Sequence, residues 1–274
     1  MPVTVSSQDH SGGPTPPDVH SGAPNLPDAR SGGPDLPEVT SRPGKGLAAR
    51  VIGVLTSPRA TYADVAARPR WLGVLIVVLI VTVVPAMALL STTVGQRAVL
   101  DQQIQVLEGF GRTVTDAQYQ QFKRMAPYAG YFAAAGQIVG LPLTALLIAG
   151  VVFSIFNGGL GANATFTQVF AIVSYSSVVT GLRAVFSAPL NYAREALTSP
   201  TNLSAILPFF DDNTFAARLL GAIDLFLIWW IVNLAIGLGV LYNRRTAPIA
   251  TTMLIVYGAI ALTIAVVRSA LAGA

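Results

Sequence analysis

The chain has 274 residues, of which 53% are hydrophobic and only 11% are charged, whereas soluble domains usually carry about 25% charged residues. This composition, with a mean hydropathy of +0.59, indicates an integral membrane protein. The small net charge of +4 is spread along the chain, which excludes the basic stripe that is typical of nucleic-acid binding. Because the chain has no cysteine, disulfides, thiolate catalysis and cysteine-bound metals are also excluded.

A ten-residue repeat fills most of residues 1–45, with the successive sequences HSGGPTPPDV, HSGAPNLPDA and RSGGPDLPEV. Few of these residues are apolar, so burial cannot offset the entropy of ordering them, and we expect a disordered tail with polyproline II character. Such a tail is either a solvated spacer or a multivalent ligand for a proline-binding domain. A signal peptide requires an apolar core near the start of the chain, and we expect none here.

Residues 46–70 form a second region. Apolar side chains recur at helical spacing from Leu47 to Leu55, and a Ser-Pro pair at 57–58 then interrupts the pattern before another short helix. The pattern predicts an amphipathic juxtamembrane segment that lies on the membrane surface. The alternative is that this segment packs under a helical bundle.

Residues 71–274 are expected to form a bundle of five transmembrane helices. At a rise of about 1.5 Å per residue, about 20 apolar residues cross the hydrocarbon core of a bilayer. Apolar stretches of roughly this length lie at 71–90, 128–156, 166–186, 218–242 and 248–268. The predicted fold class is therefore an all-α integral membrane protein with five transmembrane helices and a disordered N-terminal tail.

The second of these stretches has two features that concern helix packing. Gln137 places an amide in apolar surroundings, where it needs a hydrogen-bond partner. Gly136 and Gly140 form a GxxxG pair, a pattern that favours close contact between helices. We therefore expect another helix to pack closely against this one.

The fourth stretch contains a carboxylate, Asp224, about two turns from its start. An aspartate at membrane depth is costly, so it is expected to face a partner or a water-filled cavity. On one continuous helix, Asp224 shares a face with Gly221 and Gly239, while Trp229 and Asn233 point elsewhere. Small residues around an acid predict a helix that packs against other helices rather than against lipid.

Arg183 lies near the end of the third stretch. The third and fourth stretches are consecutive and antiparallel, so Arg183 and Asp224 are expected at similar depths in the same half of the membrane. We predict that they form an ion pair. The alternative is that Arg183 extends to the headgroups and Asp224 is hydrated through the loops.

Four stretches of the sequence have a recognisable pattern. They are SPRATY from Ser57, FNGGLGANATF from Phe156 followed by QVF at 168–170, the pairs NL and LP at 202–203 and 207–208, and DLF from Asp224 followed by Trp229. On these stretches, from about Arg50 to its end, the chain resembles the Yip1 domain family of bacterial membrane proteins. The resemblance implies five spans and a cytoplasmic N-terminus, and hence a multi-pass protein of the bacterial cytoplasmic membrane.

The resemblance implies less about activity. In eukaryotes, members of the family act in early secretory traffic and bind small GTPases of the Rab type. The DLYGP-like segment of some eukaryotic relatives has no counterpart in residues 1–45, so the resemblance does not carry GTPase binding to this chain. For bacterial members of the family, no agreed activity comes with the resemblance.

Two functions remain open. The first is a membrane-organising or partner-recruiting adaptor without catalytic activity, which acts through residues 46–70 and the tail. The alternative is a small transporter or channel, in which Gln137, Arg183, Asp224 and Asn233 form a polar path.

An enzyme is not expected, because both histidines, His10 and His20, lie in the tail and a second carboxylate at membrane depth is missing. We expect no cofactor and no metal. The expected partners are the lipid bilayer and proteins that bind the N-terminal region, with no nucleic acid, and a homo-oligomer stays open. The candidate residues for structure or function are Asp224, Arg183, Trp229, Asn233, Gln137 and Asn157.

Overall fold

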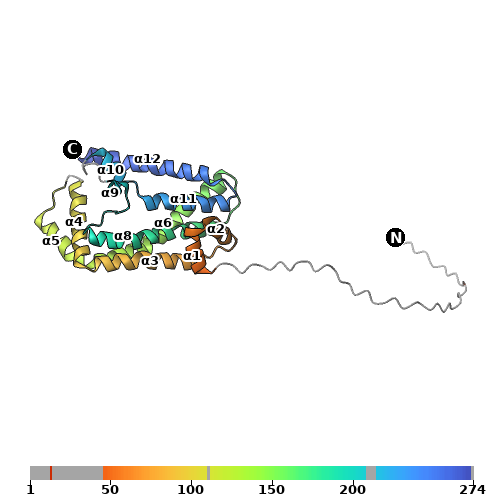
Figure 1. Cartoon of the computed structure of the whole chain (residues 1–274), viewed down its shortest axis with the longest axis horizontal. Helices are drawn as coiled ribbons and strands as arrows, with labels where there is room; N and C mark the ends of the chain where they lie inside the picture. Colours follow the sequence, from red (N-terminus) through yellow and green to blue (C-terminus); the bar gives the residue numbers. More distant parts are fainter. Residues whose placement is uncertain (1–12, 14–45, 110–111, 208–213, 273–274) are drawn as a thin grey trace, which may run out of the picture. The chain divides into compact units, whose positions relative to one another are not determined.

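The computed structural model of the chain (Figure 1) describes residues 13, 46–109, 112–207 and 214–272. The chain divides into two units, Met1–Pro43 and Gly44–Ala274, and every helix described below belongs to the second unit. The disordered tail expected at residues 1–45 lies, apart from Gly13, outside the described residues, so that expectation stays a prediction.

The described part of the chain is helical and contains no strand, which confirms the all-α class. The helices are α1 (Leu47–Thr56), α2 (Pro58–Ala67), α3 (Leu72–Leu90), α4 (Thr93–Gly109), α5 (Asp116–Met125), η1 (Ala126–Tyr128), α6 (Ala129–Phe153), η2 (Ser154–Gly159), α7 (Phe166–Ser176), α8 (Val178–Ala193), α9 (Leu203–Ile206), α10 (Phe215–Gly221), α11 (Leu225–Leu241) and α12 (Thr246–Ala272). In Figure 1, α3 runs beside α8, and α11 runs beside α12.

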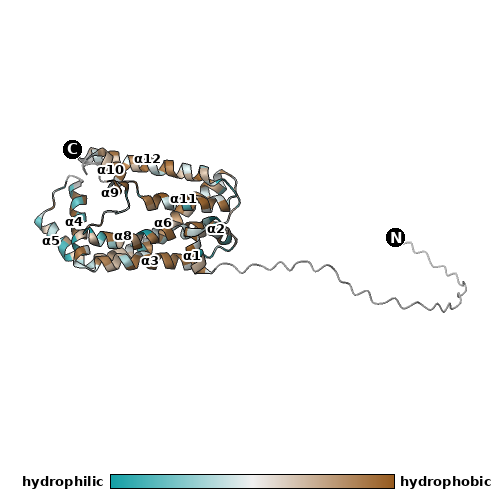
Figure 2. Ribbon diagram, in the orientation of Figure 1, coloured by the Kyte–Doolittle hydropathy of each residue, from teal (hydrophilic) through white to brown (hydrophobic). Residues whose placement is uncertain are grey.

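Four helical stretches in the described residues are long and apolar enough to cross a membrane. They are Leu72–Leu90, Asp116–Gly159, Phe166–Ala193 and Thr246–Val267. The apolar part of Phe166–Ala193 is 67% buried, compared with 11% for that of Thr246–Val267, so α7 and the start of α8 form the centre of the bundle. Figure 2 shows α11 as strongly hydrophobic, whereas α5 is largely hydrophilic. The structure is therefore that of a multi-pass membrane protein whose exposed apolar helices face lipid.

The predicted fourth span, 218–242, is wrong as a single helix. The helix is broken between α10 and α11, and the apolar part that remains, α11, has 17 residues, which is at the short end of what can cross a membrane. Asp224 has an extended backbone conformation and lies directly before α11 instead of two turns inside a helix. The expectation that it shares a helical face with Gly221 and Gly239 is consequently also wrong.

The break is stabilised by contacts from distant parts of the sequence. The backbone N–H of Leu203 donates to the carbonyl of Ile223 at 2.9 Å, and the N–H of Leu225 donates to the carbonyl of Thr201 at 3.1 Å. These bonds form an isolated antiparallel bridge between Asn202 and Asp224. The extended segment around Asp224 thus satisfies its backbone groups without a helix.

The GxxxG pair of α6 makes no close helix contact within the described chain. A Cβ atom placed on either Gly136 or Gly140 would find nothing within 4 Å. Among the described residues, no other helix therefore makes the expected close approach at this pair.

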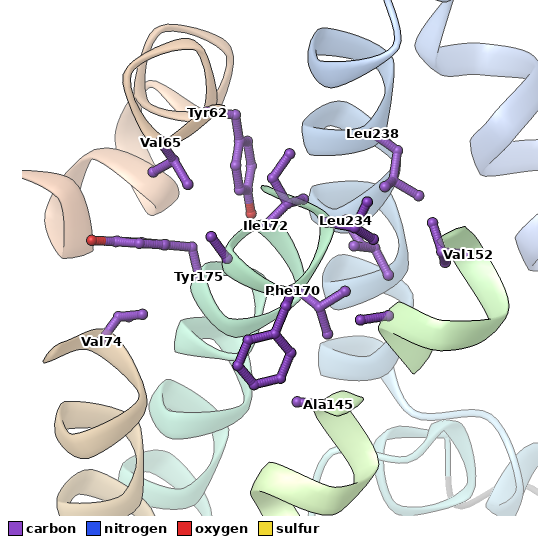
Figure 3. Close-up of a cluster of buried hydrophobic side chains, with 14 of the residues drawn as sticks. Tyr62, Val65, Val74, Ala145, Val152, Phe170, Ile172, Tyr175, Leu234 and Leu238 are labelled. Atoms are coloured by element: carbon purple, nitrogen blue, oxygen red, sulfur yellow. The ribbon is translucent and has the colours of Figure 1, made fainter. Parts of the chain in front are cut away.

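The hydrophobic core centres on α7 and takes in side chains of α2, α3, α6 and α11 (Figure 3). Tyr62 and Val65 of α2 are completely buried, and Tyr62 points between α7 and α11 toward Ile172 and Leu234. Within residues 46–70, α2 therefore packs against the bundle, and the position of the segment at the membrane surface stays a prediction.

Candidate functional site

Arg183 of α8 and Asp224 form an ion pair. The Nη2 atom of Arg183 lies 3.1 Å from Oδ2 of Asp224. The side chain of Asp224 is 10% exposed and that of Arg183 is 38% exposed, so the arginine is the more accessible partner. The ion pair predicted from the depths of the two residues is confirmed, and the alternative, in which each charge is hydrated separately, is wrong.

Two hydroxyl groups from the segment before α9 complete the environment of the carboxylate. Ser199 Oγ and Thr201 Oγ1 each donate to Oδ2 of Asp224 at 2.7 Å. Nη2 of Arg183 also donates to Ser199 Oγ at 3.2 Å. We call Arg183, Ser199, Thr201 and Asp224 the Asp224 cluster. Three donors on one oxygen stabilise the ionised form of this largely buried carboxylate.

The other carboxylate oxygen of Asp224 caps a helix. Oδ1 accepts the backbone N–H groups of Phe226 and Leu227 at 2.9 and 3.3 Å, which are otherwise unpaired donors of the first turn of α11. The backbone N–H of Asp224 donates to the hydroxyl of Tyr257 at 2.9 Å, and that hydroxyl donates to the carbonyl of Ala222 at 3.0 Å. Asp224 thus joins α8, α11, α12 and the segment before α9.

Arg183 and Gln137 line the same cavity. The cavity lies between α3, α6 and α8, has a volume of about 370 Å³ and is also lined by Leu197, Ser199 and Pro200. Asp224 is not among the residues that line it. The structure therefore brings two of the predicted residues together at one cavity, with the carboxylate behind the arginine.

Asn233 belongs to a second polar cluster, about 13 Å further along α11 at a rise of 1.5 Å per residue. It is only 2% exposed. Its Nδ2 donates to the carbonyl of Val54 at 3.1 Å, and its Oδ1 accepts the hydroxyl of Tyr62, which also lies 2.9 Å from Ser176 Oγ. We call Tyr62, Ser176, Asn233 and the Val54 carbonyl the Tyr62 cluster. Complete burial raises the pKa of Tyr62, so its hydroxyl remains protonated and able to donate.

Asn157 and Trp229 lie in neither cluster. Asn157 Nδ2 donates to the carbonyl of Ala164 at 2.7 Å, and its Oδ1 accepts the hydroxyl of Tyr242 at 2.9 Å. These bonds join the turn after η2 to the end of α11. Trp229 is partly exposed, and its ring centroid lies 5.9 Å from that of Phe226. Asn157 therefore stabilises a turn, and Trp229 packs at the surface of α11.

Several important residues were not identified from the sequence, namely Tyr62, Ser176, Ser199, Thr201 and Tyr257. Hydroxyl side chains are common in helices and loops, and nothing local distinguishes Ser176, Ser199, Thr201 and Tyr257. Tyr62 ends the SPRATY stretch that carries the family resemblance, but that pattern does not identify its hydrogen-bond partners. For the break before α11, however, a signal was present. Aspartate is a preferred helix N-cap, and Asp224 stands immediately before the continuous apolar run that forms α11.

Comparison with known proteins identifies the family. The model of the Yip1 domain matches residues 52–268. The chain is also 25% identical over 190 residues to the membrane protein YknW of Bacillus subtilis (strain 168), a match that covers 69% of this chain and 76% of that relative. No solved structure gives a significant match. Because the family model covers more than half of the chain, the protein belongs to the Yip1 domain family.

Proposed function

We propose that this protein is a membrane-organising or partner-recruiting adaptor without catalytic activity. The observation that carries the proposal is the separation of the polar residues into two clusters. Ile231 of α11 lies in the sequence between Asp224 and Asn233, and it is buried. Leu234, which directly follows Asn233, is also buried. The polar side chains of the two clusters therefore bind one another and support helix packing, which favours a scaffold over a continuous polar path.

The exposed side of α1 is the surface that suits a protein partner. Ile52 is 61% exposed, whereas Val54 on the same helix is completely buried. Residues 1–45 precede this helix directly in the chain, so a partner that binds the N-terminal region can contact both. The adaptor function is therefore assigned to α1 and the preceding residues, while α2 anchors them to the bundle. Self-association of the chain stays a prediction.

Photo-crosslinking in growing cells tests the adaptor function. A photoreactive amino acid at Ile52 is expected to give a discrete adduct with one protein, because this position would contact the partner. The matched control is Ile255 on α12, which is 66% exposed within an apolar spanning stretch and should react with lipid. Equal adduct patterns at the two positions would contradict partner binding at α1.

The cavity beside Arg183 is the observation that favours the alternative, a small transporter or channel. A transporter would use Gln137 and Arg183 to bind a polar substrate. Flux of that substrate into proteoliposomes should then fall strongly in Asp224→Asn, which removes the charge that holds Arg183 in place. Absence of any flux that depends on Asp224 supports the adaptor.

We further propose that the protein lies in the bacterial cytoplasmic membrane with its N-terminus in the cytoplasm. Arg59 Nη2 donates to Thr246 Oγ1 at 3.3 Å, so α2 and the start of α12 share one end of the bundle. Arg68 and Arg70 precede α3, and Arg244 precedes α12. Clustered arginines at this end support a cytoplasmic location.

Reporter fusions test this orientation. Alkaline phosphatase fused after Leu90 should be active, because α3 would have crossed the membrane outward. The same enzyme fused after Asn157 should be inactive, since the chain would have returned to the cytoplasm. The reverse pattern of activities would overturn the orientation.

A further inference from the structure

The cavity between α3, α6 and α8 combines polar and apolar walls. Its volume of about 370 Å³ falls within the usual range of ligand pockets, roughly 300–1,000 Å³. The polar residues that line it are Thr82, Gln137, Thr180, Arg183, Ser187, Asn191 and Ser199, and the remaining wall consists mainly of alanine and leucine side chains. Such a cavity in a spanning bundle suits a molecule with one polar and one apolar end.

Arg183 retains donors for a ligand. Its contacts with Asp224 and with Ser199 both use Nη2. Among the described residues, Nη1 and Nε have no hydrogen-bond acceptor, and a guanidinium has five N–H donors in all. The ion pair therefore fixes the position of the guanidinium while leaving an edge of it able to bind an anionic oxygen.

Two further side chains on the same face of α8 have unused acceptors. Ser187 and Asn191 follow Arg183 at intervals of four residues and therefore lie on one side of the helix. Ser187 Oγ and Asn191 Oδ1 are buried and have no hydrogen-bond partner among the described residues. Both residues line the cavity, so rotation of these side chains can direct their oxygens to a donor bound inside it.

A second, almost wholly apolar cleft adjoins the cavity. It has a volume of about 360 Å³, and it shares Leu89 and Ala188 with the cavity wall. Pro85 of α3 and Pro189 of α8 also line this cleft. The polar cavity and the apolar cleft are thus neighbours at the same α3–α8 contact.

We propose that the cavity binds the phosphate headgroup of a membrane phospholipid. Arg183 donates to a phosphate oxygen, and Asn191 and Ser187 accept hydrogen bonds from the ammonium or hydroxyl group of the headgroup. A soluble phosphate compound offers the same polar chemistry. The walls formed by spanning helices and the adjoining apolar cleft favour the lipid, because they give its hydrocarbon chain a place to lie.

Binding can be measured with the purified full chain in a mild nonionic detergent. The probes are dioctanoyl phosphatidylethanolamine, dioctanoylglycerol without a phosphate, and phosphoethanolamine without chains. The readouts are the shift in Tm and the retention of bound lipid in native mass spectrometry. The phospholipid should raise Tm in a saturable manner, whereas dioctanoylglycerol should not.

Two variants locate the effect at the cavity. Asn191→Leu removes an acceptor without disturbing the ion pair, and the apparent affinity for the phospholipid should fall about tenfold, the usual effect of one lost hydrogen bond. The double variant Arg183→Gln/Asp224→Asn removes both charges and should abolish the response. The matched control Asn163→Leu changes an exposed loop residue and should behave like the unmodified chain.

Three results would overturn the proposal. One is an equal Tm shift with dioctanoylglycerol, which would indicate hydrocarbon binding alone. Another is an equal affinity for phospholipid in Asn191→Leu and Asn163→Leu, which would place the lipid elsewhere even if the double variant failed to fold. The third is an equal response to phosphoethanolamine and the phospholipid at the same concentration, which would assign the cavity to a soluble phosphate compound.

Discussion

The Asp224 cluster and the Tyr62 cluster both hold α11 in the bundle, yet they differ in charge and in access. The Tyr62 cluster contains no charged group, and its Tyr62, Ser176 and Asn233 are all buried. The Asp224 cluster contains an ion pair, and its arginine is 38% exposed and lines a cavity. Along α11, the Tyr62 cluster is therefore closed to solvent, whereas the Asp224 cluster is partly open to it.

The difference follows from the cost of burying charge. A neutral amide and hydroxyl can be removed from water if their hydrogen bonds are replaced, whereas burial of an ion pair carries a desolvation cost that its Coulomb attraction often fails to offset. An ion pair beside a cavity avoids part of this cost. The completely buried Tyr62 cluster is thus expected to stabilise helix packing. Ligand binding is expected at the Asp224 cluster, where Arg183 lies beside a cavity.

Among the substitutions, the largest effect is expected from breaking the Asp224 cluster. Asp224→Ala removes the cap of α11 and the counterion of Arg183, and it leaves the hydroxyl groups of Ser199 and Thr201 without their acceptor, so the free energy of unfolding should fall by about 2–4 kcal/mol. Arg183→Ala should cost less, because Arg183 is partly exposed and because Ser199 and Thr201 still donate to the carboxylate. Thermal unfolding in detergent measures both losses.

The double variant Arg183→Ala/Asp224→Ala separates the pair interaction from the cap. Its loss of unfolding free energy should be smaller than the sum of the two single losses, since neither charge is then left without its partner. The loss caused by removing the helix cap should remain. Losses that simply add in the double variant would show that the two residues do not interact.

The next effect is expected from opening the Tyr62 cluster. Tyr62→Phe removes one hydroxyl and leaves Oδ1 of Asn233 buried without its donor, which should cost about 1–3 kcal/mol. Tyr128→Phe is the matched control, because Tyr128 is 58% exposed. An equal Tm for the two variants would show that the hydrogen bond from Tyr62 does not stabilise the bundle.

The two clusters also differ in how far the sequence could predict them. The Arg183–Asp224 pair was predictable because two rare charges stood at similar depths in consecutive apolar stretches. The helix break beside the pair was not predicted, although Asp224 offered a local N-cap signal. The extended segment itself depends on Thr201, Leu203 and Tyr257, which lie 21 to 33 residues from Asp224 in the sequence and reach it only in the folded chain. Local helix propensity carries no information about such contacts.

The Tyr62 cluster was even less accessible to prediction. The sequence showed that Asn233 was a polar residue in an apolar stretch, but many hydroxyl groups in the chain could have bonded with it. Its partner Tyr62 lies 171 residues away, in a segment whose weak amphipathic pattern suggested the membrane surface. The deciding factor is the packing of α2 between α7 and α11, which depends on shape rather than on polarity.

A smaller effect is expected from crowding the closed cluster. A Cβ on Gly237 of α11 would lie 2.6 Å from Ile172 Cγ2 and 3.1 Å from Tyr62 Cδ1. Gly237→Ala should therefore lower the free energy of unfolding by about 1–2 kcal/mol, the cost of overpacking reduced by the better helix propensity of alanine. Gly136→Ala on α6 meets open space and should leave Tm unchanged or slightly raised. A similar fall in both variants would indicate a general effect of alanine rather than contact with Ile172 and Tyr62.

The smallest effect is expected from removing residues 1–45. All contacts that form the two clusters lie within residues 46–272, and the repeat supplies few apolar side chains for a core. A chain that starts at Gly46 should insert, purify and unfold at the same Tm as the full chain. Aggregation or loss of this shorter protein would contradict the independence of the bundle.

A chain that starts at Trp71 makes this comparison sharper. It lacks Tyr62 and the Val54 carbonyl, so Asn233 would lose both of its recorded partners, and it lacks the ion pair in which Arg50 Nε lies 2.7 Å from Asp64 Oδ2. The space that Tyr62 fills between α7 and α11 would also be empty, and cavities of that size are strongly destabilising. We expect that this shorter chain aggregates in detergent and cannot be purified as a monodisperse protein. If it unfolds at the same Tm as the chain that starts at Gly46, the Tyr62 cluster does not hold α11 in the bundle. The proposed difference between the buried Tyr62 cluster and the partly exposed Asp224 cluster would then be wrong.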